Sequence, residues 1–125
     1  QYTALCAPSI AQYAAIEAIT HGQRDVATMR SHYVKRRNFI TSRLQEIGLE
    51  CYPPRGAFYA FPSIAKTGLS SREFAVRLLK SHKVAVVPGT AFGSCYDNHI
   101  RCSYATSIEQ LKEAMDRIAD FVNTL

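Results

Sequence analysis

Residues 99–105, HIRCSYA, constrain the fold of this 125-residue chain more than any other stretch. Their β-branched and aromatic residues alternate with polar ones, which is typical of a strand. Successive side chains of a strand point to opposite faces, so Ile100, Cys102 and Tyr104 share one face. We expect that face to pack against helices as part of the core. Arg101 would then lie on the opposite face, away from the core.

An arginine in the middle of a strand has two interpretations. The first is a solvated sheet face, which is common for charged residues. The second is an anion clamp, because a guanidinium matches a carboxylate with two parallel charge-assisted hydrogen bonds that a lysine cannot form. The alternating pattern around Arg101 is compatible with both.

Hydrophobic periodicity predicts the other elements around this strand. The predicted helices lie at residues 8–20, 24–47, 71–82 and 108–125, and the other two predicted strands at residues 57–61 and 84–87. The unit of strand 57–61, helix 71–82 and strand 84–87 is a parallel pair with a right-handed crossover. Strand 99–105 returns antiparallel between the two. The expected fold is an α+β two-layer sandwich: a small mixed or antiparallel sheet in the order 57–61, 99–105, 84–87, with helices on one face.

Local signals mark where several of these elements begin and end. Ser70 with Glu73, and Ser107 with Gln110, have the spacing of a capping box before a helix. Gly48 is predicted to end the second helix as its C′ residue. The run at residues 84–87 is apolar without alternation, which predicts a buried strand.

The first helix is apolar around most of its circumference, because alanines fill the gaps between its isoleucines. A helix of this kind needs burial on several sides. We therefore expect two parts: residues 1–22, a segment and helix that pack on a missing large domain or on another chain, and residues 23–125, which form the domain itself. The long second helix would link this domain to the rest of the protein.

Composition excludes several classes of function. The net charge of +5 is moderate, and the basic cluster at residues 35–37 is interpreted as a solvated helix face, so no nucleic-acid partner is expected. No apolar run is long enough to span a membrane. The four cysteines have no CxxC spacing, and the histidines form no pair at ligand spacing, so no metal site is expected. Reduced thiols and a cytoplasmic location are the expected setting.

Five segments, in this order, resemble the C-terminal part of class I/II aminotransferases, the fold-type I enzymes that use pyridoxal phosphate, and in particular aspartate and aromatic aminotransferases. They are residues 8–12 (PSIAQ), 33–37 (YVKRR), 54–59 (PRGAFY), 87–93 (VPGTAFG) and 100–105 (IRCSYA). Each segment is weak alone, but together they span nearly the whole chain. The resemblance implies the small domain of a homodimeric enzyme that transfers an amino group between an amino acid and a 2-oxo acid.

The resemblance also implies roles for individual residues. By motif position, Arg101 binds the substrate α-carboxylate, and Phe58, Tyr59 and Phe92 lie in segments that approach the substrate side of the cofactor. As a pattern alone, these three rings are core or loop packing. The family's cofactor lysine would precede residue 1, so no catalytic or cofactor-binding residue is assigned here and the fragment alone is expected to be inactive. The alternative is a free-standing α+β binding module that holds a carboxylate ligand through Arg101.

Two further patterns suggest cofactor chemistry, and each has a simpler interpretation. Ser63 and Lys66 have the SxxK spacing of some hydrolases and of cofactor lysines, but no glycine-rich phosphate cradle is beside them. Lys66 is interpreted as a loop lysine in a turn that ends at Gly68. Gly89 and Gly93 resemble a phosphate nest, but a loop that needs positive φ is the preferred explanation.

Overall fold

The computed structural model describes residues 6–125, and the chain divides into two compact units, Gln1–His32 and Tyr33–Leu125. The helices and strands are α1 (Ser9–His21), α2 (Gln23–Glu46), β1 (Tyr59–Ala60), α3 (Ser71–His82), β2 (Val87–Pro88), β3 (Ile100–Ser103) and α4 (Ile108–Asn123). Short 3-10 turns lie at Ala65–Thr67, Gly89–Phe92 and Ser94–Tyr96. Among the helices described, none has the length and apolar character needed to cross a membrane.

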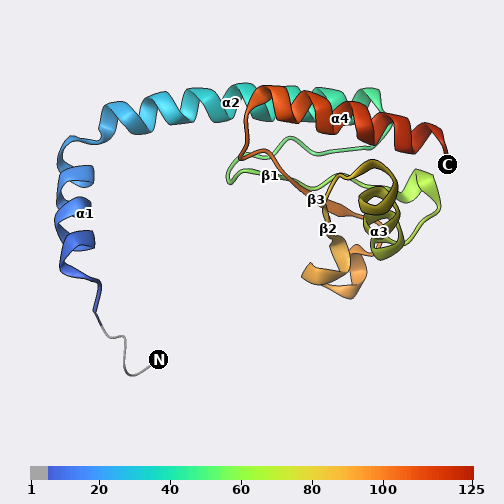
Figure 1. The fold of residues 1–125 in the computed structure, drawn as a ribbon, viewed down its shortest axis with the longest axis horizontal. Coiled ribbons are helices and arrows are strands. Elements are labelled where there is room, and N and C mark those ends of the chain that lie inside the picture. Colours follow the sequence, from blue (N-terminus) through green and yellow to red (C-terminus); the bar gives the residue numbers. More distant parts are fainter. Residues whose placement is uncertain (1–5) are drawn as a thin grey trace. The chain divides into compact units, whose positions relative to one another are not determined.

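The sheet of the second unit has the predicted order, with β3 between β1 and β2 (Figure 1). Both outer strands pair with β3 in the antiparallel sense, so they run parallel to each other. Tyr59 lies opposite Ser103, and Val87 lies opposite Arg101. The α+β class and the strand order are therefore confirmed.

The strands are shorter than predicted, and the sequence at their ends explains this. β1 stops at Ala60, close to Pro62, which has no N–H to donate to a ladder. The prediction of a buried strand at residues 84–87 was wrong, because only Val87 and Pro88 pair with β3 and both are half-buried. β2 is an edge strand, and an edge is the position at which a proline is tolerated in a sheet.

The predicted helix ends are confirmed by their hydrogen bonds. The Ser70 hydroxyl accepts from the Glu73 N–H at 3.2 Å, and the Ser107 hydroxyl accepts from the Gln110 N–H at 3.2 Å. Each hydroxyl satisfies one of the N–H groups that the first turn of a helix leaves unpaired.

Gly48 ends α2 in the way its position predicts, with φ at 87°. The Leu49 N–H donates to the Leu44 carbonyl at 2.9 Å, and the Gly48 N–H donates to the Gln45 carbonyl at 3.0 Å. These two bonds form a Schellman motif, which requires a left-handed residue at this point. Leu44 and Leu49 are both buried, so the same motif directs the segment after α2 into the core.

The core of the second unit lies between one face of the sheet and three helices (Figure 1). The sheet contributes Ala60, Ile100 and Cys102, and alternation places all three on one face. The helical part of the core consists of Ile40 and Leu44 of α2, Phe74 and Leu78 of α3, and Leu111, Met115, Ile118 and Phe121 of α4. Tyr104 is also buried on this side, as its alternation predicts, and its hydroxyl donates to the Ala57 carbonyl at 3.0 Å.

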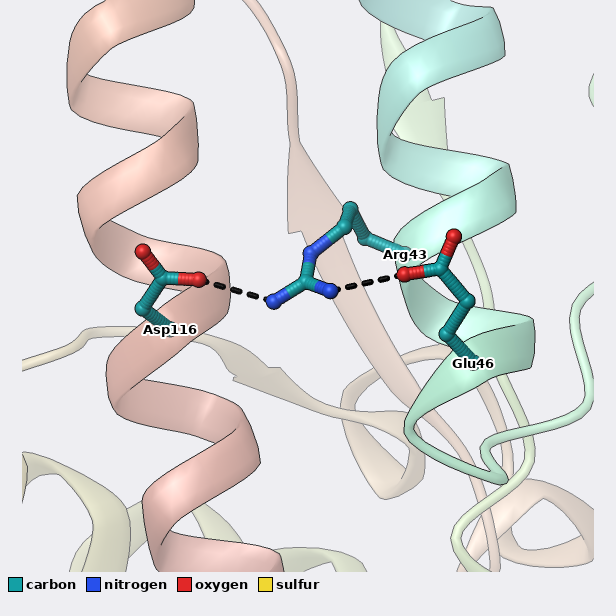
Figure 2. A network of polar contacts seen from close by, with 3 residues as sticks. All are labelled: Arg43, Glu46 and Asp116. Carbon is teal, nitrogen blue, oxygen red and sulfur yellow. Dashed lines mark hydrogen bonds and ion pairs between the residues drawn. The ribbon is translucent and has the colours of Figure 1, made fainter.

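Arg43 joins the two helices that lie side by side over the core (Figure 2). Its guanidinium donates to Glu46 of α2 at 2.7 Å and to Asp116 of α4 at 2.7 Å. The hydrogen bond with Glu46 is the largest cause of the raised pKa of Arg43; burial opposes the rise, and the hydrogen bond with Asp116 adds to it. The three side chains are at least partly exposed, so we expect them to define how the helices pair more than to supply stability.

The first unit contains α1 and the beginning of α2. No residue of α1 is buried. Ile10, Tyr13, Ile16 and Ile19 are large apolar residues on this helix and are all exposed. Within its own unit α1 therefore does not bury the apolar surface that its sequence provides.

The buried Cys102 predicts a loss of stability at alkaline pH. Burial, and then the nearby Cys51, raise the pKa of Cys102 from 9.0 to about 12. The folded state then keeps a proton that the unfolded chain releases above pH 9. The stabilisation is complete below pH 9 and is lost as the pH rises towards 12, by at most about 1.4 kcal/mol per pH unit.

Urea unfolding of the chain between pH 8 and pH 11 measures this slope. Cys102→Ala is the control: it loses stability at every pH because of lost packing, but its free energy of unfolding should fall less steeply above pH 9. Equal slopes for the two proteins would contradict the burial of a neutral thiol at this position.

Candidate functional site

Arg101 lies in the central strand, on the sheet face opposite the buried Ile100 and Cys102. The residues of β3 alternate in burial: Ile100 and Cys102 are buried, while Arg101 is half-buried and Ser103 is exposed. The Arg101 guanidinium carbon lies 4.2 Å from the centre of the Tyr59 ring and 5.0 Å from the centre of the Phe92 ring. Tyr59 comes from the neighbouring strand β1, and Phe92 comes from the 3-10 turn that follows β2. Cation–π attraction and the limited space hold the guanidinium in place.

The guanidinium N–H groups of Arg101 have no acceptor within the part of the chain that the structure describes. No described carboxylate lies within ion-pair distance of the guanidinium. Among the described residues that are not exposed, no buried side-chain nitrogen or oxygen lacks a partner, so these donors face solvent. A guanidinium offers five N–H donors. Arg101 is thus oriented by rings while its hydrogen-bonding edges remain free for an anion.

Phe92 also belongs to an aromatic cluster centred on Phe61. Phe61 contacts Phe92 at 5.8 Å and Tyr96 at 5.4 Å between ring centres, and it stacks on His99 at 5.1 Å. Edge-to-face and stacked pairs at these distances are favourable. The cluster therefore links Phe61, directly after strand β1, to the loop between β2 and β3.

Phe58 lies at the other end of the site. Its ring is 4.5 Å from that of Tyr59 and 6.2 Å from that of Tyr33 on α2. Of the three aromatic residues that the resemblance singles out, Tyr59 and Phe92 contact the Arg101 guanidinium, and Phe58 packs against Tyr59. Phe58 is 40% exposed, so its ring is still accessible from solvent.

The loop of residues 89–98 requires glycine at two positions for different reasons. Gly93 has a φ of 143°, so the predicted need for a positive φ is confirmed at this position. Gly89 does not have a positive φ, so that part of the prediction was wrong. A Cβ on Gly89 would lie 2.0 Å from the Tyr96 carbonyl oxygen and 2.6 Å from that of His99, and this close approach of backbone to backbone is what excludes a side chain.

The two sequence patterns that suggested cofactor chemistry have the simpler structures. Lys66 lies in the 3-10 turn before Gly68, and its ammonium pairs with Glu50 at 3.1 Å. The N–H groups of Gly89 and Gly93 already donate to the carbonyls of His99 and Thr90, so they cannot cradle a phosphate. No group of three potential metal ligands occurs in the described part of the chain.

Sequence reasoning missed Phe61 and His99 as members of the site. Alternation was the available signal, because Phe61 shares a strand face with Tyr59, and His99 shares one with Arg101. Phe92 was singled out only through the family resemblance of its segment, since no alternation predicts its contribution. That contribution depends on how the loop between β2 and β3 folds back over the sheet.

The family model described as "Aminotransferase class I and II" matches residues 2–118. A Bacillus subtilis relative, YugH, is 54% identical over 98% of this chain, which is 32% of the relative. The aromatic-amino-acid aminotransferase 2 of Thermococcus litoralis is 48% identical over 94% of this chain and 31% of its own length. The chain thus spans about a third of the length of the curated relatives it matches.

A solved structure gives the same result for the fold. The aromatic aminotransferase from Pyrococcus horikoshii OT3 superposes with a TM-score of 0.93 at 43% sequence identity. The match covers 98% of this chain and 33% of that one.

Proposed function

The chain belongs to the class I and II aminotransferase family, and from this premise we propose that it is the C-terminal, small-domain part of an enzyme that transfers an amino group between an amino acid and a 2-oxo acid. One observation carries the proposal at the level of residues. Arg101 lies on the sheet face opposite the core, oriented by Tyr59 and Phe92, with no acceptor for its guanidinium among residues 6–125.

In this proposal Arg101 binds the α-carboxylate that amino acids and 2-oxo acids share. The two rings lie within cation–π distance of the guanidinium, whose N–H groups lie in its plane. A carboxylate approaching in that plane accepts two parallel hydrogen bonds. The same contact serves both substrates, because the amino acid and the oxo acid differ at the neighbouring carbon.

Pyridoxal phosphate is the cofactor that the family implies for the full-length enzymes. When bound, it supplies the electron sink that stabilises carbanionic charge next to the amino group. The residues described here do not fit it, since Lys66 is paired with Glu50 and the loop glycines have no free N–H. We therefore assign cofactor binding to sequence outside residues 1–125, and we expect the chain by itself to be inactive.

The proposal also gives the exposed apolar face of the first helix a packing partner. Residues 1–22 would pack on the large domain or on another copy of the chain, and residues 23–125 would form the small domain. The exposed Ile10, Ile16 and Ile19 of α1 support this, because they would be covered in such an assembly. Homodimeric assembly is part of the same proposal.

Matched amino donors test the proposed function in the intact protein that carries this chain, loaded with pyridoxal phosphate. Phenylalanine and phenethylamine differ only by the α-carboxylate. With a 2-oxo acid acceptor, transfer from phenethylamine should be slower by about a hundredfold or more, because it lacks the group that Arg101 binds. If phenylalanine is not a donor, other amino acids are compared in the same way, each with its decarboxylated analogue. Equal rates for a donor and its decarboxylated analogue, or no transfer from any amino acid, would contradict the proposal.

A further inference from the structure

Ser71, at the start of α3, is completely buried, and all its side-chain hydrogen bonds go to the loop of residues 89–98. Its hydroxyl donates to the Asp97 carboxylate at 2.9 Å, and its backbone N–H donates to the same oxygen at 3.0 Å. The Thr90 N–H donates to the Ser71 hydroxyl at 3.4 Å. We call these three hydrogen bonds the Ser71 clasp. They join both ends of the loop to one point on the helix.

The helix does not need this hydroxyl for its own cap. Ser70 is the N-cap residue of α3, and its hydroxyl accepts the Glu73 N–H. The two adjacent serines therefore have separate partners: Ser70 bonds within the helix, and Ser71 bonds to the loop. The Asp97 carboxylate is also favourably placed at the positive end of the α3 dipole.

The loop held by the Ser71 clasp carries one of the rings on Arg101. Phe92 is the last residue of the 3-10 turn that contains Thr90, and its ring lies 5.0 Å from the guanidinium. Phe92 itself is 45% exposed, so burial alone does not fix its position. Besides the contact of the Phe92 ring with Phe61, the clasp ties the Phe92 turn to helix α3 through Thr90.

We propose that Ser71 is a positioning residue for Arg101: through the Ser71 clasp it holds Phe92 against the guanidinium and so fixes the direction of the carboxylate-binding edge. This inference rests on the proposed function, because the edge matters only if Arg101 binds a substrate. Loss of the Ser71 hydroxyl removes the two side-chain bonds of the clasp and keeps the bonds from the Ser71 backbone N–H to Asp97. It leaves the arginine and its charge in place. It frees the ring that limits the guanidinium's orientation.

Ser71→Ala in the intact protein tests this, with Ser70→Ala as the matched control. Both variants lose a hydroxyl at the same helix end, and the lost cap of Ser70 also lowers stability. At a temperature well below both unfolding transitions, Ser71→Ala should lower kcat/KM about tenfold for amino and oxo acids, with cofactor affinity unchanged. Ser70→Ala should keep the wild-type value. Asp97→Asn retains an acceptor and should retain most activity, whereas Asp97→Ala should behave like Ser71→Ala.

A second readout does not depend on catalysis. In protein labelled with ¹⁵N-arginine, the side-chain resonance of Arg101 is identified by its loss in Arg101→Lys. Ring currents from Tyr59 and Phe92 displace it, and Ser71→Ala should move it towards the position of a free arginine. An unmoved resonance together with wild-type kcat/KM in Ser71→Ala would overturn the inference. If Ser71→Ala does not fold, Asp97→Ala is used in its place. Asp97 is exposed, so its substitution should disturb the fold less than that of the buried Ser71. A moved resonance with wild-type kinetics in Arg101→Lys would instead contradict the proposed function and leave the clasp intact.

Discussion

Gly89→Ala is expected to destabilise the chain by about 3 kcal/mol or more, the upper range for overpacking a tightly packed site. The new methyl group would lie 2.0 Å from the Tyr96 carbonyl oxygen and 2.6 Å from the His99 carbonyl oxygen. Both are backbone atoms, so no side-chain rotation relieves the clash. The loop must move away from β2, which breaks the bond from the Gly89 N–H to the His99 carbonyl at 2.9 Å.

Gly56→Ala is the matched control for this substitution. A Cβ on Gly56 would have no atom within 4 Å, and Gly56 does not have a positive φ. Its substitution should change stability by about 0.5 kcal/mol or less, with a small gain from the reduced freedom of the unfolded chain. Urea denaturation of the two variants gives the comparison. Similar free energies of unfolding for both would show that the loop is not packed against Gly89 as described.

Local sequence signals predicted the parts of the fold that depend on neighbouring residues. Ser70, Ser107 and Gly48 each act within one turn of their own helix, so spacing alone was enough to predict their hydrogen bonds. The alternation of residues 99–105 correctly placed Ile100 in the core and Arg101 on the opposite face. The strand order followed from the handedness and length of the connections.

Long-range contacts determined what the sequence could not predict. The need for glycine at position 89 arises from carbonyl groups seven and ten residues later, which meet it only in the folded loop. The Ser71 clasp joins residues far apart in the sequence. Strand length was also overestimated, because apolar composition at residues 84–87 says nothing about whether a partner backbone is within reach.

Arg101→Lys in the intact protein should lower kcat/KM by about 30-fold to a few thousandfold, which corresponds to about 2–5 kcal/mol. Lysine keeps the positive charge but has neither the planar fork that matches a carboxylate nor the flat faces that pack on Tyr59 and Phe92. The loss should be similar for amino acids and oxo acids, because both present the α-carboxylate. Cofactor affinity and stability should stay near wild type, since the guanidinium forms no ion pair within the described residues.

Arg36→Lys provides a matched control in the same unit. Arg36 also lies over an aromatic ring, 5.4 Å from the centre of the Tyr33 ring, but it is on helix α2 and not on the sheet. The same chemical change there should leave the kinetics unaltered. A comparable loss of activity in both variants would show a general effect of replacing an arginine over an aromatic ring by lysine. It would not support a carboxylate contact at Arg101.

The most direct measurement is therefore kcat/KM of Arg101→Lys, determined in both directions of the transfer and alongside Arg36→Lys. The account predicts a loss of at least about 30-fold for amino and oxo acids alike, with the control unchanged. Wild-type kcat/KM in Arg101→Lys would mean that Arg101 is a solvated surface arginine, and the assignment of the carboxylate site would be wrong.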